Sequence, residues 1–148
     1  SSRGLGDVYK RQALQAVLCL YTDTTRLVKE LPTLRLLTRD PVEIEKLAHR
    51  LAKVLQECLE LCEVTVESTY SQVGSGALPV DRLQSAALKI ARPDLRRPGK
   101  TLEKLAEAFR KLRIPVIGRI SSDALWFDLR CLEDEKGFVE NLQGLKVR

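Results

Sequence analysis

The sequence has no methionine, one histidine and one tryptophan, and aromatic residues make up only 5% of its 148 residues. So low an aromatic content argues against an aromatic platform for stacking nucleic-acid bases. No apolar stretch reaches the ~18 residues that a membrane-spanning helix needs. The lack of a long apolar stretch therefore excludes a membrane-spanning helix, and the low aromatic content disfavours an aromatic nucleic-acid platform.

The residues that are present suit a globular domain. Hydrophobic residues make up 44% of the chain and charged residues 30%, which is enough apolar material for a core without disulfide or metal staples. The chain also lacks the continuous apolar segment of a secretory signal. Its four cysteines are therefore interpreted as reduced thiols, and we expect a cytoplasmic protein.

The absence of methionine predicts that the chain is a piece of a longer protein. Residues 1–12 show no apolar period and resemble a translated adapter scar, so we interpret them as a non-native leader. The native part is then expected at residues 13–148, as one domain with a helix leading into it. The net charge is +5 for the whole chain. The leader carries Arg3, Lys10 and Arg11 against Asp7, and the mildly basic remainder does not indicate nucleic-acid binding by itself.

The clearest helical pattern runs over residues 41–61. Asp40 can cap it, Pro41 suits its first position, and Glu43 completes a capping box. Apolar residues then recur at three- and four-residue steps from Ile44 to Cys58. Shorter helices are predicted at residues 13–21, 24–31 and 133–142, and a further helix is predicted to begin at a cap formed by Thr101. Residues 33–38 are expected to form a connecting segment.

Four segments are predicted as strands, at residues 63–72, 85–91, 115–120 and 124–129. A tight turn at residues 121–123 would join the last two as a hairpin. Hairpin strands interspersed with helices indicate an α+β domain, with an antiparallel sheet covered by helices.

The sequence offers no catalytic residue and no metal site. His49 lies mid-helix between charged neighbours, where an exposed histidine is more common than a catalytic base. Cys58 and Cys62 lie one helical turn apart, but no further ligands are near them. We therefore assign neither a nucleophile–base pair nor a metal cluster.

Two segments are candidates for ligand binding. Gly74, Ser75 and Gly76 form either a plain turn or a ligand loop, because flexible backbone can approach a ligand closely. Gly118 interrupts an apolar strand, and such a glycine marks close approach of a ligand or of another backbone. Arg119 beside it needs an anionic partner, either Asp128 on the facing strand or a bound anionic ligand.

Two further basic features have a structural and a functional interpretation. Arg130 is expected to pair with Asp128 or Glu133. The basic loop at residues 92–100 is either solvated or in contact with a phosphate backbone.

Four segments together resemble bacterial selenocysteine synthase, the L-seryl-tRNA(Sec) selenium transferase family. They occur in order and at compatible spacing, as ELPTLRLLT at residues 30–38, SQVGSGALP at 71–79, PVIGRI at 115–120 and LWFDLR at 125–130. The resemblance extends over about residues 13–142.

This resemblance implies the small C-terminal domain of a fold type I transferase that depends on pyridoxal 5'-phosphate. Members convert seryl-tRNA(Sec) to selenocysteinyl-tRNA(Sec) with selenophosphate as the selenium donor, and they assemble as homo-oligomers, typically decamers. The cofactor would be bound mainly by the large domain, whose Gly-Asp-Lys motif lies upstream of this sequence. Asp7 and Lys10 do not supply that motif, so the chain alone is expected to be inactive.

Within the resemblance, Arg119 and the segment Gly74, Ser75 and Gly76 are the candidate substrate-binding residues. The seryl carboxylate is esterified to tRNA and carries no charge, so Arg119 would meet selenophosphate or the tRNA 3′ end. The alternatives are a stand-alone α+β binding or regulatory module, and another enzyme of the same fold type.

Overall fold

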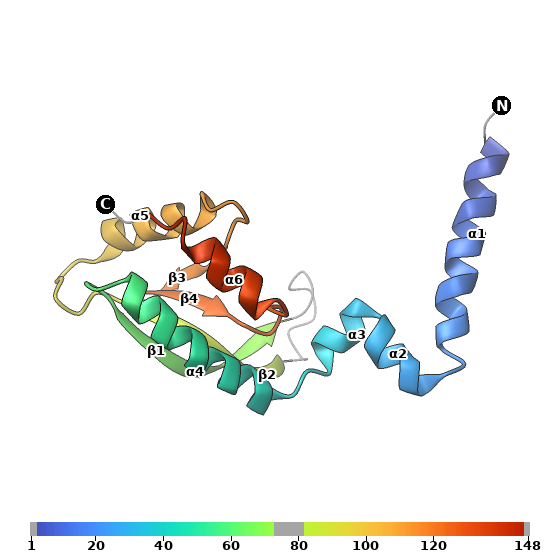
Figure 1. Cartoon of the computed structure of the whole chain (residues 1–148), viewed down its shortest axis with the longest axis horizontal. Coiled ribbons are helices and arrows are strands. Elements are labelled where there is room, and N and C mark those ends of the chain that lie inside the picture. The colour runs from blue at the N-terminus through green and yellow to red at the C-terminus, as the bar shows by residue number, and fades with distance from the viewer. Residues whose placement is uncertain (1–2, 73–81, 147–148) are drawn as a thin grey trace. The chain divides into compact units, whose positions relative to one another are not determined.

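The computed structural model describes residues 3–72 and 82–146, which divide into two compact units, Ser1–Arg39 and Asp40–Arg148. Figure 1 shows their elements in chain order. The candidate loop residues Gly74, Ser75 and Gly76 lie outside the described residues.

The first unit is helical and contains α1 (Arg3–Leu20), α2 (Thr24–Glu30) and α3 (Pro32–Leu37). The sequence predicted a shorter first helix and a connecting segment in place of α3, and both predictions were wrong. Helix α1 continues across residue 13 because no proline interrupts it. Pro32 starts α3, since a proline fits the first helical turn, where its missing N–H has no partner to lose.

The boundary predicted between leader and domain does not coincide with a structural one. The helix α1 crosses it, and the compact second unit begins only at Asp40. Neither fact bears on where residues 1–12 come from, so the leader and the domain at residues 13–148 stay predictions.

The second unit contains a four-stranded antiparallel sheet with strand order β1-β2-β4-β3. Its strands are β1 (Glu63–Gln72), β2 (Arg82–Ala91), β3 (Arg119–Ser121) and β4 (Ala124–Asp128). Strand β2 pairs with β1 along its whole length and with β4 on its other side. The predicted α+β class and the antiparallel sheet are therefore confirmed.

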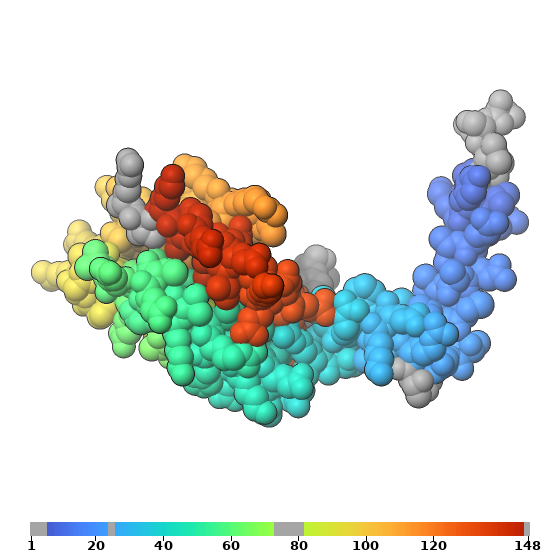
Figure 2. Space-filling model, viewed as in Figure 1, coloured from blue at the N-terminus to red at the C-terminus, as the bar shows by residue number. Residues whose placement is uncertain are grey.

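Helices α4 (Pro41–Cys58), α5 (Gly99–Arg110) and α6 (Glu135–Leu142) all pack on one face of this sheet. The sheet supplies alternate residues to the core, as predicted, and the helices supply their apolar stripes. The largest fully buried side chains are Phe109, Ile44, Leu51, Leu55, Leu88, Ile90, Leu102 and Leu125. Figure 2 shows α4 and α6 side by side over this core.

The cap predicted for the long helix is confirmed. Asp40 is extended and its Oδ1 accepts the backbone N–H of Val42 at 2.9 Å. The helix ends at Cys58 rather than at residue 61, and α5 is capped by Pro98 instead of Thr101. Because Pro98 can only begin a helix, the helical hydrogen bonds start there, with Leu102 N–H donating to Pro98 O.

The strand predicted at residues 115–120 is mostly wrong, since β3 begins only at Arg119. Pro115 has no N–H to donate, and the N–H of Val116 donates to Phe109 O at the end of α5. The segment is thus held to helices before it joins the sheet. Ser122 and Asp123, with φ of 50° and 54°, then form the tight turn that was predicted.

Among the described residues, no helix is both long and apolar enough to span a bilayer.

Candidate functional site

Arg119 lies on the face of the sheet that α4, α5 and α6 leave uncovered. It is directly opposite Trp126 of β4, which in turn is opposite Lys89 of β2 and, beyond it, Thr65 of β1. Residues in register on neighbouring strands share a face, so these four form one row across the sheet. We call Lys89, Trp126 and Arg119 the cation–tryptophan row.

The indole ring lies between the two cations of this row. Lys89 Nζ is 5.6 Å from the ring centroid and Arg119 Cζ is 6.0 Å from it. These distances suit cation–π attraction, which is strongest for tryptophan. The indole N–H donates to Ser121 O at 2.9 Å, which ties the ring to the neighbouring strand β3.

Arg119 is exposed and forms no ion pair with any described residue. The sequence left open whether Asp128 or an anionic ligand would be its partner. Asp128 is engaged elsewhere, so the structure rejects the ion pair. The guanidinium is left with its hydrogen-bond donors toward solvent, where an anion can reach them.

Asp128 joins three strands at the end of the same sheet face. Its Oδ2 accepts from Ser71 Oγ at 2.5 Å, and its Oδ1 accepts from Ser85 Oγ at 2.7 Å and from the backbone N–H of Arg130 at 3.0 Å. Both serines are buried. A carboxylate accepts several hydrogen bonds at once, so Asp128 satisfies both buried hydroxyl groups.

This arrangement ties together two of the sequence segments that carry the resemblance. Ser71 opens the segment at residues 71–79, and Asp128 lies in that at 125–130. Arg130, predicted to form an ion pair, is buried, and its guanidinium donates to the carbonyl of Gln84. Asp128 and Arg130 are therefore hydrogen-bonded to the ends of β1 and β2 that flank the glycine-containing segment in the sequence.

Gly118 is explained by the approach of another backbone. A Cβ at this position would lie 2.7 Å from Trp126 O and 2.7 Å from Phe127 Cε1. Of the two explanations that the sequence left open, the structure shows contact with β4. The glycine lets residues 114–118 lie tightly against the sheet.

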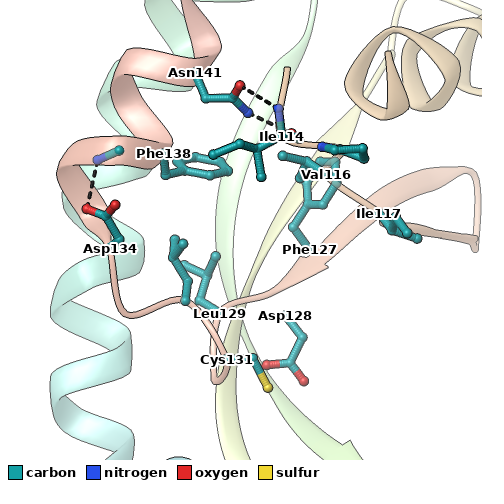
Figure 3. Close-up of a pocket in the computed structure, with 13 residues that line it drawn as sticks. Ile114, Val116, Ile117, Phe127, Asp128, Leu129, Cys131, Asp134, Phe138 and Asn141 are labelled. Carbon is teal, nitrogen blue, oxygen red and sulfur yellow. Dashed lines mark hydrogen bonds between the residues drawn. The ribbon is translucent and has the colours of Figure 1, made fainter. Parts of the chain in front are cut away.

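An apolar groove of about 360 Å³ lies between this segment, β4 and α6. Figure 3 shows Phe127, Leu129 and Phe138 among the side chains that line it. Asn141 of α6 accepts from the N–H of Ile114 at 3.1 Å and donates to its carbonyl at 2.8 Å. This pair of hydrogen bonds holds one wall of the groove to α6.

The groove does not fit pyridoxal phosphate. The cofactor needs a lysine for its aldehyde and donors for its phosphate, and no lysine, arginine or histidine occurs among the described residues that line the groove. The described part of the chain also contains no cluster of three metal-ligating side chains.

The remaining candidate residues are ordinary. His49 is exposed, with its Nε2 4.0 Å from Glu45 Oε1. Arg92 of the basic loop forms a two-pronged ion pair with Asp94 at 2.9 and 2.8 Å. Cys62 is buried, and that burial raises the pKa of its thiol, although the charge of Arg92 opposes the rise.

The sequence interpretation missed Lys89, Asn141 and the hydrogen-bonded group of Ser71, Ser85 and Asp128, which we call the serine–aspartate cluster. Lys89 follows Leu88 and precedes Ile90, so strand alternation already placed it opposite the core. No local pattern indicated that Ser71, Ser85 and Asp128 meet, because their contact depends on the order of the strands in the sheet.

Comparison with known families gives one match over most of the chain. The model of a family described as L-seryl-tRNA selenium transferase matches residues 7–133. That range contains the cation–tryptophan row and the serine–aspartate cluster.

Individual relatives agree with this match. An L-seryl-tRNA(Sec) selenium transferase of Klebsiella pneumoniae (strain 342) is 52% identical over 130 residues, which are 88% of this chain and 28% of that protein. Proteins of the same name from Yersinia pestis (strain Pestoides F) and Yersinia pseudotuberculosis serotype O:1b (strain IP 31758) are each 50% identical over 131 residues. The chain therefore spans 28% of the length of these relatives.

Proposed function

We propose, given that this chain belongs to the L-seryl-tRNA selenium transferase family, that it is the C-terminal part of an enzyme that makes selenocysteinyl-tRNA(Sec). The substrate would be seryl-tRNA(Sec) and the selenium donor selenophosphate. The observation that carries the proposal is 52% identity sustained over 88% of this chain. Such continuous similarity favours the transferase over a stand-alone binding or regulatory module.

The cofactor of this proposed enzyme is pyridoxal 5'-phosphate, as the resemblance implies. The apolar groove between residues 114–118, β4 and α6 does not fit it, so we assign its binding to parts of the polypeptide outside this chain. The chain alone is then inactive. The described fold, a helix-covered antiparallel sheet, is compatible with the small domain of a fold type I enzyme.

Arg119 is the residue that we propose contacts an anionic group of a substrate. Support comes from its exposure, its lack of an ion pair among the described residues, and the commitment of Asp128 to Ser71 and Ser85. Selenophosphate and the phosphates near the tRNA 3′ end both carry the required charge. Gly74, Ser75 and Gly76 stay a second proposed contact, next to Ser71 in the sequence.

The setting of the enzyme is also proposed from the family. We expect a cytoplasmic homo-oligomer, a decamer by resemblance. Isolation of the complete enzyme, followed by light scattering, would measure the number of subunits.

A chimeric enzyme tests the proposed function directly. The matched residues of this chain would replace the corresponding segment of the Klebsiella pneumoniae relative, and conversion of seryl-tRNA to selenocysteinyl-tRNA would be measured with labelled selenium. We expect conversion by the chimera and none by the relative with that segment deleted. A folded, cofactor-loaded chimera that leaves seryl-tRNA unchanged, beside an active parent enzyme, would contradict the proposal.

A further inference from the structure

The cation–tryptophan row has the composition of a small binding surface for single-stranded nucleic acid. It places one flat aromatic ring between two cations on an uncovered sheet face. Proteins bind unpaired nucleotides by stacking bases on aromatic rings and by placing lysine and arginine along the phosphates. The row contains both elements.

Its charged groups are available to a ligand. Arg119 forms no ion pair with a described residue, and Lys89 Nζ lies 3.9 Å from Glu67 Oε1, at the long end of the ion-pair range. Such a partly exposed pair contributes little and exchanges easily. Asp128, on the same sheet face, accepts hydrogen bonds from Ser71 and Ser85 instead.

The ring itself is held in place. The hydrogen bond from the indole N–H to Ser121 O fixes the orientation of the ring. Ser121 is itself paired in the sheet with Ala124, which is fully buried. The ring is therefore pre-arranged, and a base that stacks on it does not have to order it first. The low aromatic content of the chain excludes an extended array, but one ring is enough for one base.

We propose that the cation–tryptophan row binds the unpaired 3′ end of the RNA substrate. Neighbouring phosphates would draw the exposed cations Arg119 and Lys89 off the indole ring, and a base would stack on the ring face that they leave. The proposal rests on the proposed function for the identity of the RNA, and it adds Lys89 and Trp126 to Arg119. It also chooses between the two anions considered for Arg119. A free phosphate group would use the cations and leave the indole ring without a role.

Trp126 is the only tryptophan of the chain, so its fluorescence reports on this surface alone. The 148-residue chain would be titrated with a four-nucleotide single-stranded oligoribonucleotide, with inorganic phosphate and with a blunt RNA duplex. We expect saturable quenching by the oligoribonucleotide only, weakening with salt with a slope of about −1.4 for two phosphate contacts. Absence of quenching, or equal quenching by inorganic phosphate, would overturn the proposal.

Variants separate the row from general charge attraction. Binding of a labelled oligoribonucleotide would be measured by fluorescence anisotropy after circular dichroism has shown that each variant is folded. Trp126→Leu is expected to weaken binding by roughly 5- to 150-fold, and Arg119→Ala and Lys89→Ala each to lower the salt slope. The matched control is Arg113→Ala, an exposed arginine outside the row. Equal weakening by Arg113→Ala would show non-specific attraction and reject the site.

The chimeric enzyme distinguishes failure of this inference from failure of the proposed function. In an active chimera, Trp126→Leu should raise the KM for seryl-tRNA more than it lowers kcat. Unchanged KM and unchanged RNA binding in an active chimera would refute the row alone. An inactive chimera whose row still binds the oligoribonucleotide would refute the transferase function alone.

Discussion

At the scale of single residues, Gly118 and Arg119 are neighbours with opposite environments. Gly118 is crowded by β4, whereas Arg119 is exposed beside Trp126. The glycine brings the chain close enough for β3 to form, and β3 then presents the arginine on the uncovered face. The position of the candidate binding residue thus depends on the absence of a side chain one residue earlier.

Gly118→Ala should destabilise the second unit. The added Cβ would lie 2.7 Å from both the Trp126 carbonyl oxygen and Phe127 Cε1, and such overpacking costs about 1–3 kcal/mol. Urea unfolding followed by circular dichroism measures the free energy of unfolding. The control is Gly99→Ala, because a Cβ there would contact nothing within 4 Å. Equal stability of the two variants would contradict the interpretation of Gly118.

The sequence indicated several residues correctly and could not decide others. The Asp40 cap was predictable because it depends on neighbours in the chain. The close approach at Gly118 was predictable, but its cause was not, because β4 meets it only in the folded sheet. For the same reason the partner of Asp128 could not be chosen from the sequence.

At the scale of secondary-structure elements, Asp128 connects β4 to β1 and β2 at one end of the sheet. Its two carboxylate oxygens accept hydrogen bonds from Ser71 and Ser85, one serine on each of those strands. Three strands that meet at one side chain can separate there only if two buried hydroxyl groups lose their partner. On this face, the end of the sheet is therefore held by polar contacts, in addition to the apolar packing of Ala86 and Phe127 on the other face.

Asp128→Ala is expected to lower the free energy of unfolding by about 2–3 kcal/mol, because it leaves two buried hydroxyl groups without an acceptor. Urea unfolding again provides the measurement. Glu67→Ala is the matched control, because Glu67 is a carboxylate on the same face, separated from Asp128 by Ala87, and it pairs only weakly with Lys89. If both variants lose the same stability, the cluster has no special role.

The ion pair between α4 and α6 predicts a pH dependence. Arg50 donates to both oxygens of Glu135 at 2.8 and 2.7 Å, which lowers the pKa of Glu135 below its ordinary value of 4.5. The folded state thus holds this proton less tightly than the unfolded state. The pair's stabilising effect is complete above pH 4.5 and is lost as pH falls through the lowered pKa.

Comparison with Glu135→Gln tests this dependence. The difference in thermal midpoint between the original chain and the variant should be small at pH 7, as for any exposed ion pair, and should shrink further with added salt or below pH 4.5. Glu140→Gln, an exposed glutamate on the same helix, is the control. A difference that grows as the solution is acidified would contradict the expected sign.

Among the elements, long periodic ones were predictable and proline-bounded ones were not. The helix α4 and strands β1, β2 and β4 were expected from periodicity alone. Pro32 and Pro98 misled because a proline next to a helix marks its start as readily as its end. Residues 115–118 look like a strand, but the N–H of Val116 donates to Phe109 O of α5, and the preceding residue Ile114 is hydrogen-bonded to Asn141 of α6.

At the scale of the whole molecule, the apolar core belongs to the second unit alone. All buried apolar residues described lie between Ile44 and Leu142. No described side chain of residues 6–39 is buried, although Leu14, Leu18 and Tyr21 are large and apolar. Stability in solution should therefore be a property of residues 40–148.

Removal of residues 1–39 tests that expectation. The shortened chain should unfold in one cooperative transition at the same urea concentration as the full chain, within about 0.5 kcal/mol in free energy. Far-ultraviolet circular dichroism and the fluorescence of Trp126 should give coincident transitions. A broad transition, or a large loss of stability, would show that the second unit needs the first.

The α+β class was predictable from the sequence, because hairpin signals and helical periods alternate along it. The division at Asp40 was not, since residues 13–39 have apolar side chains that suggest burial. An apolar side chain indicates that a residue can be buried. Which residues bury it depends on the fold and cannot be predicted from composition. The family resemblance, in contrast, could be recognised from four short segments and agrees with the match over residues 7–133.

The sheet order also has a consequence for the time at which the chain can fold during its synthesis. Strand β2 lies between β1, which precedes it directly, and β4, whose Asp128 pairs with Ala87. About forty residues separate that pair, so at ~5–20 residues per second the ribosome needs roughly two to eight seconds to deliver β4. During that interval α4 and the β1–β2 hairpin precede β4 out of the ribosome, so the edge of β2 that will pair with β4 is unpaired. An unpaired strand edge can pair with another chain, so the nascent chain most needs protection at this stage.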